Sequence, residues 1–414
     1  MYNCKVRTHV YWEKLNKDGN KTMKPTVKIV SLLLAVMMLL TAVMSGCSLS
    51  KEWSYKANDK ELAIGVYIYA LYNSYNRALS YAEKLDDYDS TKDTWLEMEI
   101  TDDDGNTEVA SKWIKEQAQL ICLEILAVEQ ELNRLGASAD EATLANLDSA
   151  AESNWNFGTT YTQYIGYVQP LKTTLEPYGI SYDSFKMVTS TFVANEDKLF
   201  ELLYHEGGEQ AVSKDDIKKY FDENYVKYSY LPVQLYTSTT DEAGTSSNVA
   251  MSDADVKKIT DQFDGYVKQV NAASNPSETS SKLLSEYLTA NGKDESSIVN
   301  NTAKNDETNA GEELENAIKE LGLGKATTLK VGEGENATLY YVYRYTQQEA
   351  EDEYLTDGSN DDSLIAKMKE KDFTAYLKDL ADKLDYQKNG AVDGYNPKMF
   401  FVAKEPETTA AAAE

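Results

Sequence analysis

Residues 213–239 read SKDDIKKYFDENYVKYSYLPVQLYTST, and the pattern changes halfway along this stretch. Ser213-Lys214-Asp215-Asp216 has the form of a capping box and predicts a short helix over 215–224. The next part, 228–239, is rich in Tyr, Thr and Val, which is typical of a strand. The switch from helical to β-type composition predicts a domain boundary near residue 225.

Downstream of this boundary, the sequence predicts one small α+β domain over 226–346. Helical patterns occupy 252–272, 278–288 and 312–321, and Leu339-Tyr340-Tyr341-Val342-Tyr343 returns as a strand. The expected order is therefore β, α, α, α, β. We expect 347–404 to return to the preceding domain through an amphipathic helix at 363–386 and a strand at 396–402. A low-complexity tail follows at 405–414.

Upstream of the boundary, residues 59–225 predict a helical domain. The stretch 61–85 is apolar nearly all round a helix, which is typical of a buried helix. Apolar residues recur at helical spacing over 107–135, and Gly136 supplies a C-terminal stop. Ser181 is placed to cap a further helix. The predicted fold class is α+β, with a mainly helical N-terminal domain, a small α+β insert and a C-terminal helix that completes the first domain.

The N-terminus has the layout of a secretory signal. A basic stretch beginning at Met23 precedes an apolar run over 29–44, which is shorter than a membrane span requires. The run ends in Met44-Ser45-Gly46-Cys47, which resembles a bacterial lipobox. This resemblance implies that residues 1–46 are removed, with Met23 the expected true start. It also implies that Cys47 carries diacylglycerol, which anchors the chain in a lipid bilayer. Residues 47–58 are expected to form the lipidated tether.

Composition excludes several classes of function. The formal net charge of −28 repels phosphate backbones, so we expect no nucleic-acid partner. Three Cys and two His cannot supply the usual four-ligand zinc site, and we expect no metal and no other cofactor. Asp102-Asp103-Asp104-Gly105-Asn106 looks like a fragment of a calcium loop but lacks the remaining ligand spacing, so it predicts a turn. Cys122 and His205 are expected to be structural, and no catalytic residue is expected.

The order of these parts resembles the PrsA/SurA family of extracytoplasmic foldases and chaperones. The resemblance is most specific at Gly179-Ile180-Ser181 with Phe185, and at 212–224, which is similar to the segment leading into a parvulin (PpiC-type) domain. Leu321-Gly322-Leu323-Gly324-Lys325 looks like the turn before the last parvulin strand. Parvulin domains isomerise prolyl peptide bonds with one histidine on the first strand and one on the last. Here those positions hold Pro232 and Tyr341, which implies a degenerate domain.

Three hypotheses follow. The first is a membrane-anchored chaperone or foldase on the extracytoplasmic face of the cell membrane, whose partners are unfolded or partly folded exported polypeptides. The second is a lipid-anchored solute-binding protein of a transporter, which predicts two lobes of alternating strands and helices. The third is an active peptidyl-prolyl cis/trans isomerase, which differs from the first only in catalysis. The absent histidines favour the first over the third.

The lipobox predicts a specific modification. Cys47→Ser is expected to abolish incorporation of radiolabelled palmitate and to leave an uncut precursor on a gel, because the cysteine thiol is the group that is alkylated. Cys122→Ser is the matched control and is expected to keep the label. Labelling of the Cys47→Ser protein at the wild-type level would contradict the assignment.

Overall fold

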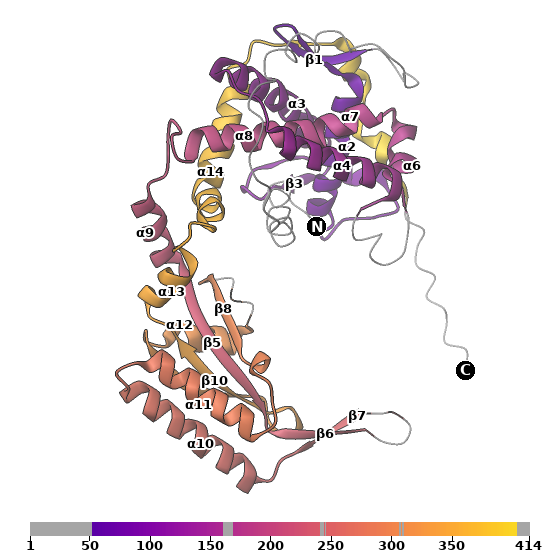
Figure 1. The fold of residues 1–414 in the computed structure, drawn as a ribbon. Helices are drawn as coiled ribbons and strands as arrows, with labels where there is room; N and C mark the ends of the chain where they lie inside the picture. Colours follow the sequence, from indigo (N-terminus) through magenta and orange to yellow (C-terminus); the bar gives the residue numbers. More distant parts are fainter. Residues whose placement is uncertain are drawn as a thin grey trace, which may run out of the picture. The chain divides into compact units, whose positions relative to one another are not determined.

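The computed structural model describes residues 52–159, 169–240, 244, 246–305, 308 and 310–403 (Figure 1). They form two compact units: unit 1 comprises Met1–Gln210 and Lys369–Glu414 as far as these are described, and unit 2 comprises Ala211–Met368. Unit 2 is thus inserted into unit 1. The first boundary follows Gln210, and the second falls within the helix α14 (Asp361–Asp382). The expected signal at 1–46, Cys47 and the tail at 405–414 lie outside the described residues. Among the described residues, no helix combines the length and the apolar character needed to span a bilayer.

Unit 1 is mainly helical, with two small antiparallel sheets of strand order β11-β1-β2 and β3-β4. Its strands and helices are β1 (Trp53–Ala57), β2 (Lys60–Ala63), α2 (Ile64–Ala82), β3 (Glu99–Thr101), β4 (Thr107–Val109), α3 (Ala110–Leu135), α4 (Glu141–Phe157), α6 (Leu171–Leu175), α7 (Tyr182–Lys186), α8 (Phe192–Tyr204), the C-terminal part of α14 (Asp361–Asp382) and β11 (Gln387–Lys388).

Helix α2 is the centre of unit 1. Every residue from Ile64 to Leu71 is buried, so two full turns contact protein on all sides, as the apolar pattern predicted. The helix begins at Ile64 rather than at 61 because Lys60–Ala63 pairs with β1 instead. Helix α3 packs along α2 and ends at Gly136, whose φ of 65° is the left-handed C-cap expected from the sequence.

The C-terminal segment completes unit 1. On α14, the Tyr376 hydroxyl donates a 2.8 Å hydrogen bond to Glu131 of α3. Farther along the segment, strand β11 pairs with β1. Phe400 lies in an aromatic cluster, with its ring centroid 5.3 Å from that of Tyr72 and 4.9 Å from that of Tyr178. The first helical hairpin and the last described residues therefore share one core.

Two local expectations for unit 1 were wrong. Trp53–Ala57, expected within the tether, form β1, because Tyr55 and Ala57 are buried and the strand has partners on both edges. The strand expected at 396–402 is a 3₁₀ turn over Pro397–Phe400, begun by Asn396 Oδ1, which accepts the Lys398 N–H at 3.0 Å. The C-terminal strand is β11 instead.

Unit 2 is an α+β domain around a four-stranded antiparallel sheet of order β8-β5-β10-β9, with a two-stranded ribbon, β6-β7. Its strands and helices are α9 (Lys214–Asn224), β5 (Tyr225–Gln234), β6 (Tyr236–Thr240), β7 (Ser246–Ala250), α10 (Asp253–Ala272), α11 (Pro276–Ala290), β8 (Val299–Lys304), α12 (Glu312–Glu320), β9 (Lys325–Val331), β10 (Thr338–Arg344), α13 (Gln347–Tyr354) and the start of α14.

The expected order of one strand, three helices and a returning strand is present in unit 2, but the first strand is divided into β5 and β6, and β7, β8 and β9 are additional. Ser213 caps α9, as the sequence predicted, by accepting the Asp216 N–H. Helix α9 belongs with the sheet because Phe221 stacks on Tyr225 of β5 and on Tyr354 of α13, at 5.2 and 5.1 Å between ring centroids. Unit 2 therefore begins at Ala211 and extends to Met368, whereas 226–346 was expected from the sequence.

The close approach of α2 and α7 generates a stability prediction. A Cβ atom on Gly65 would lie 2.5 Å from Ser184 Oγ and 3.2 Å from the Gly179 carbonyl oxygen. Gly65→Ala is expected to lower the free energy of unfolding of unit 1 by about 2 kcal/mol, because overpacking outweighs the gain in helix propensity. Urea unfolding followed by circular dichroism measures this.

Gly265 of α10 is the matched control, since a Cβ atom there has no neighbour within 4 Å. Gly265→Ala is expected to raise stability by about 0.5–1 kcal/mol. Equal effects of the two substitutions would contradict the tight α2–α7 approach.

The contact that fastens α14 to α3 generates a second prediction. Arg134 and the Tyr376 hydroxyl both donate to Glu131 and lower the pKa of this carboxyl, while burial and the Glu131 bond raise the pKa of Tyr376 to about 12. Tyr376→Phe is expected to cost about 1.5–3 kcal/mol of unfolding free energy at neutral pH. Because the folded-state pKa of Glu131 is lowered, this contribution is present above the unfolded value of about 4.3 and is lost as the pH falls through the folded value.

Tyr386→Phe is the control for this prediction, because the Tyr386 hydroxyl accepts an exposed bond from Gln119. We expect it to cost less than about 0.5 kcal/mol. A Tyr376→Phe effect that stays constant between pH 7 and pH 3 in urea titrations would show that the ionised Glu131 is not the partner that matters.

Candidate functional site

The two faces of the unit 2 sheet have different coverings. Leu231 and Val233 of β5 and Tyr341 of β10 belong to a core cluster shared with Phe263 of α10 and Leu284 of α11. On the other face, Tyr228 and Val342 pack with Leu314 and Ile318 of the short helix α12. Figure 1 shows α10 and α11 side by side along the sheet. One face is thus covered by two long helices and the other by a helix of nine residues.

Tyr341 is a core residue. Its side chain is 1 % exposed, and its hydroxyl lies 2.9 Å from Ser280 Oγ of α11 in a buried hydrogen bond. Burial raises its pKa to about 12. The phenol therefore stays neutral and is already paired beneath α11, so it is not available to a substrate.

Pro232 lies on the opposite face from Tyr341. It pairs with Tyr340, whereas Tyr341 pairs with Leu231, and adjacent residues of a strand point to opposite faces. The Asn305 N–H donates to the Asn224 carbonyl, so the backbone N–H and C=O groups of even-numbered residues in β5 point toward β8. The pairing of β5 with β8 stops at Tyr230 and Val299, two residues before Pro232. The sheet therefore loses no hydrogen bond through the missing N–H of Pro232. The structure does not bring the two positions together.

The face that carries Pro232 has a half-buried aromatic surface, which we call the tyrosine face and define as Tyr230, Pro232, Leu329 and Tyr340. All four side chains are intermediate in exposure. The rings of Tyr230 and Tyr340 meet edge to face, with 5.9 Å between their centroids. Burial raises the pKa of Tyr230, so its hydroxyl is a neutral donor at any physiological pH. The surface thus offers apolar ring area and two hydroxyl groups without charge.

Helix α12 beside the tyrosine face is held by an arginine. Arg344 Nη1 donates to the carbonyl oxygens of Lys319 and Leu321, each at 2.9 Å. These are carbonyl groups at the C-terminal end of α12, where a cation also complements the helix dipole. The arrangement fixes the helix that borders the tyrosine face.

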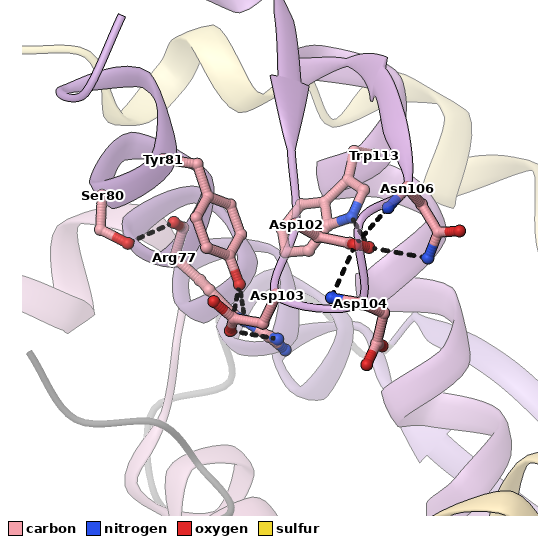
Figure 2. Close-up of polar contacts among 8 residues, drawn as sticks. All are labelled: Arg77, Ser80, Tyr81, Asp102, Asp103, Asp104, Asn106 and Trp113. Atoms are coloured by element: carbon pink, nitrogen blue, oxygen red, sulfur yellow. Dashed lines mark hydrogen bonds and ion pairs between the residues drawn. The ribbon is translucent and has the colours of Figure 1, made fainter.

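The acidic sequence at 102–106 is a hairpin turn between β3 and β4, as predicted. Figure 2 shows Asp102 accepting the N–H groups of Asp104 and Asn106, at 3.1 and 2.8 Å, and the Trp113 indole N–H at 3.3 Å. Burial alone would raise the pKa of Asp102, but these donors lower it. In the described part of the chain, no group of three or more His, Cys, Asp or Glu residues is arranged to hold a metal ion.

Asp103 of the same turn is engaged by α2. The Tyr81 hydroxyl donates to Asp103 Oδ2 at 2.7 Å, and Arg77 pairs with the same oxygen at 3.2 Å (Figure 2). Both contacts lower the pKa of Asp103, with the Tyr81 bond the larger cause. The turn therefore docks the hairpin on α2, which is a structural role.

The remaining single residues have structural surroundings. Cys122 is fully buried in α3, and burial raises the pKa of its thiol, so it is not a nucleophile. His205 follows α8 directly, and its ring lies 5.9 Å from that of Phe200 between centroids. Both positions agree with the expectation from the sequence.

Two small hollows open on unit 1. One of about 90 Å³ is lined by Tyr55, Tyr67 and Gln119 among others, and one of about 290 Å³ lies beside the β1–β2 turn and the end of α3. Lys60 and Glu129, which line the larger hollow, pair with each other at 2.8 Å. The two α/β lobes that a solute-binding protein requires are not the architecture of either described unit.

Of the comparisons with known proteins, only the one with solved structures found similar proteins. No family model matches the chain, and no curated protein matches it. The fold is similar to that of the foldase PrsA from Streptococcus pneumoniae, with 13% identity, a TM-score of 0.30, and coverage of 73% of this chain and 99% of that one. It is also similar to PrsA from Bacillus subtilis, with 14% identity, a TM-score of 0.24, and coverage of 70% and 91%.

Proposed function

We propose that this chain is a membrane-anchored chaperone or foldase that assists the folding of exported polypeptides on the extracytoplasmic side, without efficient prolyl isomerisation. The observation that carries the proposal is the tyrosine face. Its half-buried rings offer contact area to apolar side chains of an unfolded chain, and they do so without charge and without a shaped pocket. Such a surface accepts many sequences, as a chaperone requires.

The absence of isomerase activity is proposed from the surroundings of Pro232 and Tyr341. Isomerisation must lower a barrier of about 18–20 kcal/mol by stabilising a twisted amide. Tyr341 is buried and bonded to Ser280, while Pro232 lies on the other face and has no polar side chain. The two positions therefore offer no pair of polar groups around one bound peptide bond.

The proposed anchor places unit 1 close to the bilayer. Five residues separate Cys47 from Trp53, where β1 begins, and this length of chain reaches about 20 Å at most. Without residues 1–46 the chain keeps 34 Lys and Arg and 67 Asp and Glu residues, and its net charge of −33 repels anionic lipid headgroups. The tether, rather than surface adsorption, would therefore hold the protein at the membrane.

The test is refolding of a proline-limited protein with and without the purified full-length chain, scoring the slow-phase rate and the yield separately. We expect a higher yield at an unchanged rate. An accelerated slow phase would show an active isomerase, and an unchanged yield would overturn the chaperone proposal.

Tyr230→Ser with Tyr340→Ser is expected to remove roughly half of the gain in yield or more, because the tyrosine face loses its ring area. Tyr266→Ser is the matched control, since Tyr266 packs on the cluster beneath the other sheet face. Equal losses for the double variant and the control would show that the tyrosine face is not the binding surface.

A further inference from the structure

The ribbon β6-β7 has two open edges and no covering layer. Its pairs run from Tyr236↔Ala250 to Thr240↔Ser246. Eight of its ten residues are exposed, the exceptions being Tyr236 and Asn248. Within the described residues, it touches the rest of unit 2 through its base and the neighbouring turn at Gly334–Asn336. Away from its base and from this turn, the ribbon is exposed to solvent.

The side chains of the ribbon bond one another across the strands. Ser238 Oγ donates to Asn248 Oδ1 at 2.8 Å, and two hydroxyl pairs, Thr239 with Ser247 and Thr240 with Ser246, follow at 3.2 Å each. The N–H and C=O groups of the outer backbone remain for a partner. The Met251 N–H donates to the Leu235 carbonyl, which shows which residues bond across the ribbon. The backbone N–H and C=O groups that point outward are therefore those of Tyr236, Ser238 and Thr240 on β6 and of Ser246, Asn248 and Ala250 on β7.

The edges of the ribbon lack the features by which proteins protect edge strands. None of its ten residues is charged or proline, in a chain that is 27% charged. The edge of β9 in the main sheet differs, because the Asn271 side-chain amide bonds Ala326 N–H and C=O at 2.8 and 3.0 Å, as a neighbouring strand would. The other outer strand, β8, ends in Lys304.

We propose that the outer edges of the β6-β7 ribbon bind an extended segment of a client polypeptide by strand addition. The inference rests on the proposed function and names what this second surface recognises, which is backbone N–H and C=O groups in extended conformation. Main-chain bonds give affinity without selecting a sequence. The occupant is a client rather than a second copy of this chain, because two copies of this strongly acidic chain repel each other, whereas a neutral or basic segment is not repelled.

The experiment measures binding of a fluorescent peptide of alternating Thr and Val, with one Lys at each end, to the full-length chain by anisotropy. The same peptide with N-methyl groups on two adjacent central residues, which blocks both of its edges, is expected to bind about tenfold more weakly. This comparison leaves the protein unchanged. Equal affinity of the two peptides, or no binding of either, would overturn the inference.

Ser238→Pro with Asn248→Pro removes two outward N–H groups and leaves the ladder between β6 and β7 intact. It is expected to weaken binding of the unmethylated peptide about tenfold. Ser238→Ala with Asn248→Ala removes the same side-chain bond but keeps the backbone donors, and is expected to stay within about twofold. Equal losses in the two double variants would show side-chain recognition and contradict the inference.

Sedimentation of the wild-type chain and of the proline variant tests whether the ribbon instead binds a second copy of this chain. A dimer of the wild-type chain that becomes a monomer in the proline variant would assign the ribbon to self-association and overturn the client assignment. The refolding assay tests the proposed function separately. If the peptide does not bind but the gain in refolding yield is retained, only the proposed role of the ribbon is wrong. If there is no gain in yield, the proposed chaperone function is wrong.

Discussion

Contacts between segments far apart in the sequence close both units, and the remaining packing depends on them. In unit 2, β5 and β10 pair over seven residues, from Gln234 with Thr338 to Tyr228 with Arg344. In unit 1, Tyr376 bonds Glu131 across 245 positions, and β11 adds to β1. Each such contact must overcome the entropy of closing a long loop, which grows slowly with loop length. These closures complete the cores to which α2 and α3, and the helices over the sheet, belong.

Much of the helical framework could be predicted from the sequence because its signals are local. Gly136, Ser181 and Ser213 act at helix ends as their residue types predict, and each needs only its nearest neighbours along the chain. The helix after Ser181 contains a π turn at Met187–Thr191, where Ser190 Oγ bonds Asp148 of α4. That interruption depends on a partner distant in sequence, and the apolar spacing does not indicate it.

Strands were harder to predict because a strand is defined by its neighbour. β8 lies in the polar stretch 291–310, and β7 lies between the strand predicted at 228–239 and the helix predicted at 252–272. The Ser-Thr-Thr run before Gly244 and the Ser-Ser-Asn-Val run after it were the available signal for the ribbon. For the candidate site, the sequence identified Pro232 and Tyr341, but only the register shows that they lie on opposite faces.

The insertion of unit 2 into unit 1 also constrains the order in which the protein can fold as its chain emerges during synthesis. Synthesis proceeds from the N-terminal end, so the segments of α2 and α3 appear long before residues 369–403, which complete their core. Unit 2 is continuous in sequence and can close as soon as Met368 has emerged. Until residues 369–403 have followed, the apolar surface of α2 lacks its final cover. A protein proposed to shield unfolded exported chains would itself pass through a stage in which it needs shielding.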